Sequence, residues 1–109
     1  MKTLHLELVT PSSRVYRGDV RSVTVPAWKG EMGVLPGHAP FLGLLNAGRV
    51  TVRVPAATAG PGPRVLSFTI TGGCAEVLPD RVTIMADSAA PSDGGRPGQP
   101  VPSSPVPST

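Results

Sequence analysis

Aromatic residues and cysteine are scarce in this chain of 109 residues. Its only aromatic side chains are Tyr16, Trp28, Phe41 and Phe68, too few and too scattered for the stacking platform of a protein that binds single-stranded nucleic acid or carbohydrate. The single cysteine, Cys74, excludes an intramolecular disulfide bond. A chain with a single cysteine fits a reducing compartment.

The sequence also lacks a cluster of charges of one sign and a long apolar run. Ten Lys and Arg residues against seven Asp and Glu residues give a net charge of +3, but the basic residues stand singly along the chain. Proteins that bind nucleic acid concentrate such charge on one face. No run approaches the roughly 18 apolar residues of a membrane span, and the opening residues alternate Leu with His and Glu, unlike a signal peptide. We therefore expect a soluble protein of the cytoplasm.

Motifs for catalysis and for cofactor binding are incomplete. Residues 43–48 have the glycine spacing of a phosphate loop, but Arg49 and Val50 occupy the positions where Lys and Ser or Thr would have to follow. The carboxylates are single, which gives no pair for acid–base catalysis. The strong metal ligands are far apart and lack paired spacing: His5, His38 and Cys74. The sequence thus predicts no catalytic residue, no cofactor and no metal site.

The main pattern in the sequence is the recurrence of apolar residues at every second position. This period of two is typical of β-strands. It predicts strands at residues 3–9, 20–25, 33–35, 42–45, 49–54, 65–71, 74–78 and 81–86, separated by turns rich in Gly and Pro. No segment has a helical period, so the pattern indicates an all-β sandwich or barrel. Residues 1–89 form the predicted domain, and residues 90–109, rich in Pro, Ser and Gly, form a predicted disordered tail.

The most distinctive stretch is K-G-E-M-G-V-L-P-G-H-A-P at residues 29–40. Its three glycines and two prolines predict consecutive tight turns that display Glu31, Met32 and His38 on a constrained backbone. Such a stretch is either a plain pair of β-turns or a docking edge. A rigid turn suits docking because binding then costs little conformational entropy.

Several motifs, in one order, resemble the ATP synthase epsilon subunit family. G-E-M-G-V-L-P-G-H matches the family signature G-E-x-G-[IV]-x-P-G-H. It lies between an opening L-H-L-E-L-V-T-P and, further on, N-A-G at 46–48, G-G at 72–73 and V-T-I-M-A-D at 82–87. This resemblance implies a β-sandwich of two roughly five-stranded, mostly antiparallel sheets. It also implies a non-catalytic rotor subunit of the central stalk, at the cytoplasmic face of the bacterial inner membrane.

The resemblance also implies two partners within that complex, where the chain would be present as one copy. Glu31, Met32 and Gly33 match the turn that faces the polar loops of the c ring, while Thr10 and His38 match positions that meet the gamma subunit. Docked in this way, the chain would help to couple ion-driven rotation to ATP synthesis. It would not itself catalyse a reaction.

The region after the predicted domain departs from the family, whose members commonly continue into two helices that inhibit ATP hydrolysis. Six prolines at positions 91, 97, 100, 102, 105 and 107 disfavour such helices here. We therefore expect helical inhibition and ATP sensing to be absent.

Two other interpretations of the whole chain are a stand-alone ligand-binding β-sandwich, which the few aromatic residues disfavour, and a small enzyme, which the missing motifs disfavour.

Overall fold

A computed structural model describes residues 2–55 and 64–92, and every regular element in those ranges is a β-strand. The ten strands are β1 (Leu4–Val9), β2 (Arg14–Val20), β3 (Ser22–Ala27), β4 (Gly30–Val34), β5 (Phe41–Leu45), β6 (Gly48–Val54), β7 (Arg64–Ile70), β8 (Gly73–Leu78), β9 (Arg81–Ala86) and β10 (Ala89–Pro91).

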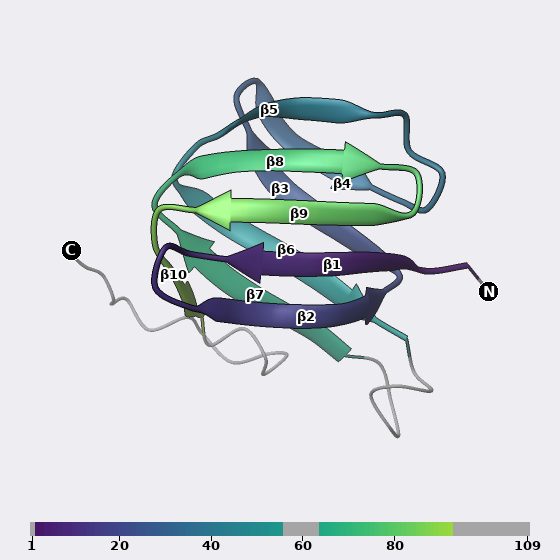
Figure 1. Ribbon diagram of the computed structural model, residues 1–109, viewed down its shortest axis with the longest axis horizontal. Coiled ribbons are helices and arrows are strands. Elements are labelled where there is room, and N and C mark those ends of the chain that lie inside the picture. Colours follow the sequence, from purple (N-terminus) through teal and green to yellow (C-terminus); the bar gives the residue numbers. More distant parts are fainter. Residues whose placement is uncertain (1, 56–63, 93–109) are drawn as a thin grey trace.

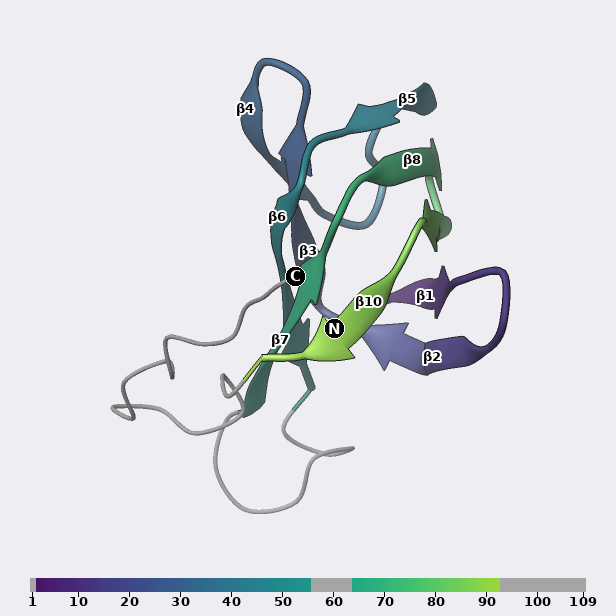
Figure 2. The ribbon, with the colours of Figure 1, turned by 90° about the vertical axis from the view of Figure 1, so that its left-hand side faces the viewer.

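The strands form one hydrogen-bonded sheet that folds into two layers of five (Figures 1 and 2). The front layer has the order β2-β1-β9-β8-β5, and the rear layer has the order β4-β3-β6-β7-β10. Between the layers, β3 pairs with β5 through Ala27 and Leu45. Among the described strands, β1 and β9 are the parallel pair and all other pairs are antiparallel. The predicted sandwich of two five-stranded sheets is confirmed.

The core lies between the two layers and follows from the alternation in the sequence. Leu4, Leu6 and Leu8 of β1 are fully buried, and the valines of β6 face them from the rear layer. Each such side chain contributes about 1.5–3 kcal/mol when it is withdrawn from water. Tyr16 of β2 packs against Phe68 of β7, with ring centroids 5.9 Å apart and planes tilted by 56°. This aromatic contact links the edge of the front layer to the rear layer.

The predicted strands are all present, but β2 and β10 were not predicted. In β2 only Val20 is fully buried, so the segment shows no apolar alternation. Its pairing with β1 also shifts register at Val9. The short β10 ends in Pro91 and pairs only with β7 among the described strands. An edge position tolerates a residue that has no N–H group to donate.

The stretch at residues 29–40 differs from its prediction. Instead of consecutive turns, residues 30–34 form the extended strand β4, which pairs with β3 along its whole length. A type II turn follows, with Pro36 and Gly37 at its centre. Gly37 has a φ of 88°, and the N–H of His38 donates to the carbonyl of Leu35 at 3.0 Å.

The sheet extends past residue 89, where the sequence analysis ended the domain. β10 runs to Pro91, and the N–H of Ser92 donates to the carbonyl of Ser67 at 2.9 Å. The division into a domain and a tail stays a proposal, in which residue 92 is the better boundary. The part of the predicted tail after Ser92 lies outside the described residues.

Candidate docking surface

An apolar row crosses the outer face of the front layer. It consists of Val9 of β1, Met85 of β9, Cys74 of β8 and Leu44 of β5, which lie opposite one another on successive strands. Leu44 is 68% exposed and Met85 is 40% exposed, and Leu42, next along the same face of β5, is 73% exposed. Exposed apolar side chains that adjoin in this way mark surfaces that bind other proteins.

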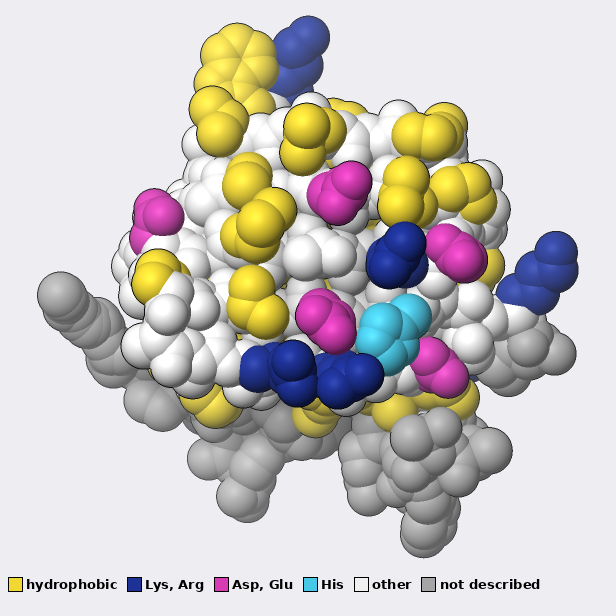
Figure 3. Space-filling model, in the orientation of Figure 1, with side chains coloured by type: hydrophobic (Ala, Val, Ile, Leu, Met, Phe, Trp, Pro, Cys, Tyr) yellow, Lys and Arg dark blue, Asp and Glu magenta, His cyan; other side chains and the backbone are white. Residues whose placement is uncertain are grey.

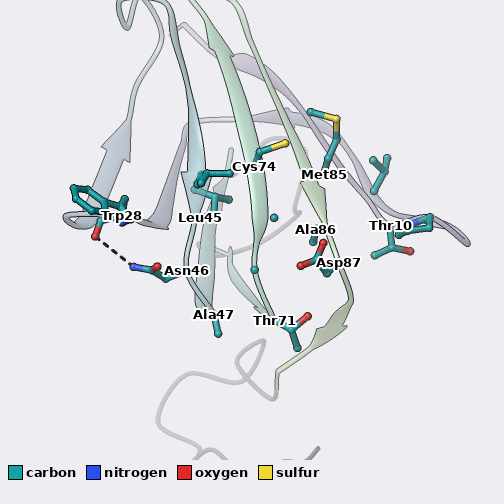
Figure 4. Close-up of a pocket in the computed structure, with 15 residues that line it drawn as sticks. Thr10, Trp28, Leu45, Asn46, Ala47, Thr71, Cys74, Met85, Ala86 and Asp87 are labelled. Carbon is teal, nitrogen blue, oxygen red and sulfur yellow. Dashed lines mark hydrogen bonds between the residues drawn. The ribbon is translucent and has the colours of Figure 1, made fainter.

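The apolar row forms one side of an open groove with a volume of about 910 Å³ (Figure 4). Trp28 stands at one end of the groove and Thr10 at the other, and Asn46, Thr71 and Asp87 add polar atoms to its rim. A small-molecule site needs a few polar groups that converge on one point. This lining is open and mostly apolar, which suits a macromolecular partner better.

Two adjacent glycines are among the residues that line the groove. Gly72 and Gly73 have φ values of 129° and 145°, and the N–H of Asp87 donates to the carbonyl of Gly72 at 2.9 Å. A Cβ on Gly73 would collide with the carbonyl oxygen of Met85 and lie 2.8 Å from the Cα of Ala86. The G-G pair in the sequence is therefore the signal of a close approach between β8 and β9.

Charged side chains gather toward the lower right of the same face in Figure 3, although acidic side chains also lie among the hydrophobic ones elsewhere on it. His5 Nδ1 lies 3.2 Å from Asp19 Oδ1, and Arg17 Nε lies 3.5 Å from Glu7 Oε2. His5 Nε2 also lies 3.9 Å from the Glu7 carboxylate. Pairs this exposed contribute at most about 1 kcal/mol each to stability. The front face thus carries the apolar row on one side and these charge pairs on the other, with the exposed Glu76 of β8 opposite Leu42.

The structure places the two predicted gamma-facing residues, Thr10 and His38, at opposite ends of the front layer. Thr10 follows the end of β1 and lines the groove, where its backbone N–H donates to the carbonyl of Ser13 at 2.8 Å. His38 precedes the start of β5, which runs in the same direction as β1, and its Nδ1–H donates to the carbonyl of Ala39 at 2.6 Å. Of the two, only Thr10 adjoins the apolar row.

Glu31, Met32 and Gly33 lie together on β4, at an edge of the rear layer. Among the described strands β4 pairs only with β3. Pro26, which lies opposite Glu31, has no N–H, and its carbonyl accepts from the N–H of Asn46 at 2.8 Å. The main-chain groups of Glu31, and of Gly33 two residues on, therefore point away from β3.

The side chains of these three β4 residues differ in exposure. Glu31 is exposed and Met32 packs partly against the core. Gly33 has no positive φ, and a Cβ there would meet nothing within 4 Å. Gly33 thus lies in a regular strand, as the strand predicted at residues 33–35 requires, and not in one of the tight turns predicted for residues 29–40.

Sequence reasoning missed the main members of this surface, namely Trp28, Leu42, Leu44 and Met85. β5 has the sequence F-L-G-L-L, with apolar residues on both faces. A period of two cannot say which of its faces points outward. A short strand with apolar residues on both faces must expose one of them unless a partner covers it, and this pattern was the signal in the sequence that could have found the surface.

Within residues 2–55 and 64–92, no group of three or more His, Cys, Asp or Glu side chains could hold a metal ion. The same ranges contain no helix of the length and apolar character that a membrane crossing requires.

Comparisons with known proteins agree on one family. Residues 3–92 match the family described as "ATP synthase, Delta/Epsilon chain, beta-sandwich domain". The ATP synthase epsilon chain of Halalkalibacterium halodurans is 43% identical over 94 residues, covering 85% of this chain and 65% of that protein. The epsilon chain of Solibacter usitatus is 47% identical over 87 residues, covering 80% of this chain and 60% of that protein. The chain thus spans less than two thirds of the length of these relatives.

The chain is also similar in fold and sequence to a solved structure. The matching chain is one in the mitochondrial ATP synthase of Euglena gracilis, in a structure of OSCP, F1 and the c-ring. The TM-score is 0.72 at 27% sequence identity, and the match covers 84% of this chain and 54% of that one.

Proposed function

The chain belongs to the ATP synthase delta/epsilon family, and from this premise we propose that it is a non-catalytic rotor subunit of the central stalk. In this proposal it docks on the gamma subunit and on the c ring and helps to couple ion-driven rotation to ATP synthesis. Its place is the cytoplasmic face of a bacterial plasma membrane, held there through the complex. The observation that carries the proposal is the exposed apolar row on a domain of this family.

The gamma subunit is the proposed occupant of the groove and the apolar row. Burying Leu42, Leu44 and Met85 against a partner removes three large apolar side chains from water. Thr10 borders the same groove, as the family resemblance implies for a residue that meets gamma. His38 lies at the far end of the front layer, so a contact between His38 and gamma needs a partner that spans the sheet.

The c ring is the proposed partner of the β4 edge. The exposed carboxylate of Glu31 and the outward main-chain groups of Glu31 and Gly33 offer polar contacts to the loops of the ring. The apolar row lies on the front layer and β4 on the rear layer, so in this proposal the two partners contact different strands.

The proposed role is mechanical, and the fold suits it. Torque that passes from ring to stalk requires a body that resists shear. Strands that are hydrogen-bonded to their neighbours within each of the two layers supply this resistance. The expectation that helical inhibition is absent depends on residues after Ser92 and is not part of this proposal.

Replacing Leu44 with Asp tests the proposal. The Leu44→Asp chain should fold normally, because Leu44 points to solvent, but it should lose most of its affinity for the purified gamma subunit, about 30-fold or more. Isothermal titration calorimetry measures the affinity. Thr69→Asp, at an exposed position on the rear layer, is the matched control and should bind like the wild type. A wild-type chain that does not bind gamma at low salt would refute the assignment.

A further inference from the structure

Trp28 is the most exposed aromatic side chain in the described part of the chain. It follows β3 and occupies the tip of the hairpin that leads into β4, with 69% of its surface exposed. Exposing an indole ring of this size to water is unfavourable. No contact within the core accounts for its presence at this position.

The tip of this hairpin is held in place by Asn46, which follows β5. The N–H of Asn46 donates to the carbonyl of Pro26 at 2.8 Å, and its Nδ2 donates to the carbonyl of Ala27 at 3.2 Å. The same Nδ2 donates to the carbonyl of Trp28 at 3.5 Å, the bond drawn in Figure 4. The pairing of Ala27 with Leu45 anchors the same two segments. Asn46 therefore fixes the backbone that presents Trp28 at the wall of the groove.

Trp28 also continues the apolar row. Five large hydrophobic side chains are exposed in the described ranges: Trp28, Leu35, Leu42, Leu44 and Met85. Trp28, Leu44 and Met85 line one groove, and Leu42 neighbours Leu44 on the same face, so only Leu35 lies apart. A surface that combines an indole at one end with aliphatic side chains beside it matches the centre of a protein interface.

We propose that Trp28 is the anchor side chain of this chain for its gamma subunit, and that Asn46 is the positioning residue that holds it ready. The inference rests on the proposed function, which names the partner but not the residues that dominate its binding. The partner surface that fits is a shallow apolar pocket at one end of an apolar stripe. Because Asn46 orders the hairpin before binding, little conformational entropy is lost when the indole is buried.

Fluorine labelling of the single tryptophan tests this directly. With 5-fluorotryptophan incorporated, the chain has one ¹⁹F resonance, from Trp28. Addition of unlabelled gamma subunit should shift and broaden that resonance, because the ring moves from water into an interface. Trp28→Ala should weaken gamma binding about 30-fold or more by calorimetry. Leu35→Ala is the control, an exposed hydrophobic residue outside the groove, and should stay within about twofold of the wild type.

The role of Asn46 needs a readout that separates positioning from general stability. Asn46→Ala should weaken gamma binding about fivefold in the wild-type background and have no further effect in the Trp28→Ala background. Equal losses in both backgrounds would contradict the positioning role. If the wild type binds gamma and Trp28→Ala binds equally well, with no ¹⁹F shift, the anchor role is wrong while the proposed function stands. If the wild type does not bind gamma at all, the proposed function itself fails.

Discussion

At the scale of single residues, backbone geometry separates two glycines that look alike in the sequence. Gly33 and Gly73 each precede or occupy a predicted strand, but only Gly73 has a positive φ, of 145°. The space around them differs as well, since a Cβ at Gly33 would point into open space and one at Gly73 would enter the backbone of β9. The G-E-M-G stretch at residues 30–33 thus contains the more replaceable of these two glycines.

Gly73→Ala should lower the free energy of unfolding by about 2–4 kcal/mol, because it adds both φ strain and a backbone collision. Gly33→Ala is the matched control and should change it by less than about 1 kcal/mol. Urea denaturation followed by circular dichroism measures both. Equal stabilities of the two variants would mean that β8 can move away from β9 at no cost.

Tyr16 gives the fold a measurable dependence on pH. Partial burial, and secondly the negative charge of Asp19, raise the pKa of Tyr16 above its ordinary value of 10.0. The folded state therefore holds the phenol proton more tightly than the unfolded state does. Its contribution to stability is complete below pH 10 and is lost as the pH rises through the raised value.

The unfolding free energy of the wild type should accordingly fall more steeply above about pH 10 than that of Tyr16→Phe. Because Tyr16 is the only tyrosine, the ultraviolet absorbance of the phenolate reports its titration alone. A titration midpoint identical in the folded and the urea-unfolded chain would contradict this expectation.

At the scale of elements, the short edge strand β10 tests where the domain ends. Its three residues pair with β7, and Ser92 adds a backbone hydrogen bond to Ser67. A chain truncated after Ser92 should keep the thermal midpoint of the full chain. One truncated after Ser88 loses these bonds and should be less stable by about 1–3 kcal/mol. Equal midpoints for the two truncated chains would show that β10 contributes nothing to stability.

The elements also show how far the sequence could predict this fold. Strands with one apolar face, such as β1 and β6, were predicted to within one residue of their bounds. β2 was missed because it lies at an edge, where few of its side chains are buried. The apolar row was missed for another reason: its members come from β1, β5, β8 and β9, and only strand pairing brings them together.

At the scale of the whole molecule, the two proposed partner surfaces approach one another at the β3–β4 hairpin, but they consist of different side chains and should fail separately. Glu31→Gln removes one exposed charge from the β4 edge and should weaken association with the c ring less than about fivefold. It should leave gamma binding and the thermal midpoint unchanged. Ring association measured with detergent-solubilised c rings checks this, and a loss of gamma binding by Glu31→Gln would contradict the division into two surfaces.

The parallel pairing of β1 with β9 has a consequence for how the molecule is made. His5 lies opposite Arg81, so the first strand to leave the ribosome completes its layer only after almost the whole domain has been synthesised. Val9 comes from the start of the domain, Leu44 from its middle, and Cys74 and Met85 from its end, so they do not adjoin on a nascent chain. The surface proposed for assembly therefore exists only on a finished, folded domain. Chains that lack β9 also lack this surface, so the fold itself would delay the proposed recruitment until β9 has been synthesised.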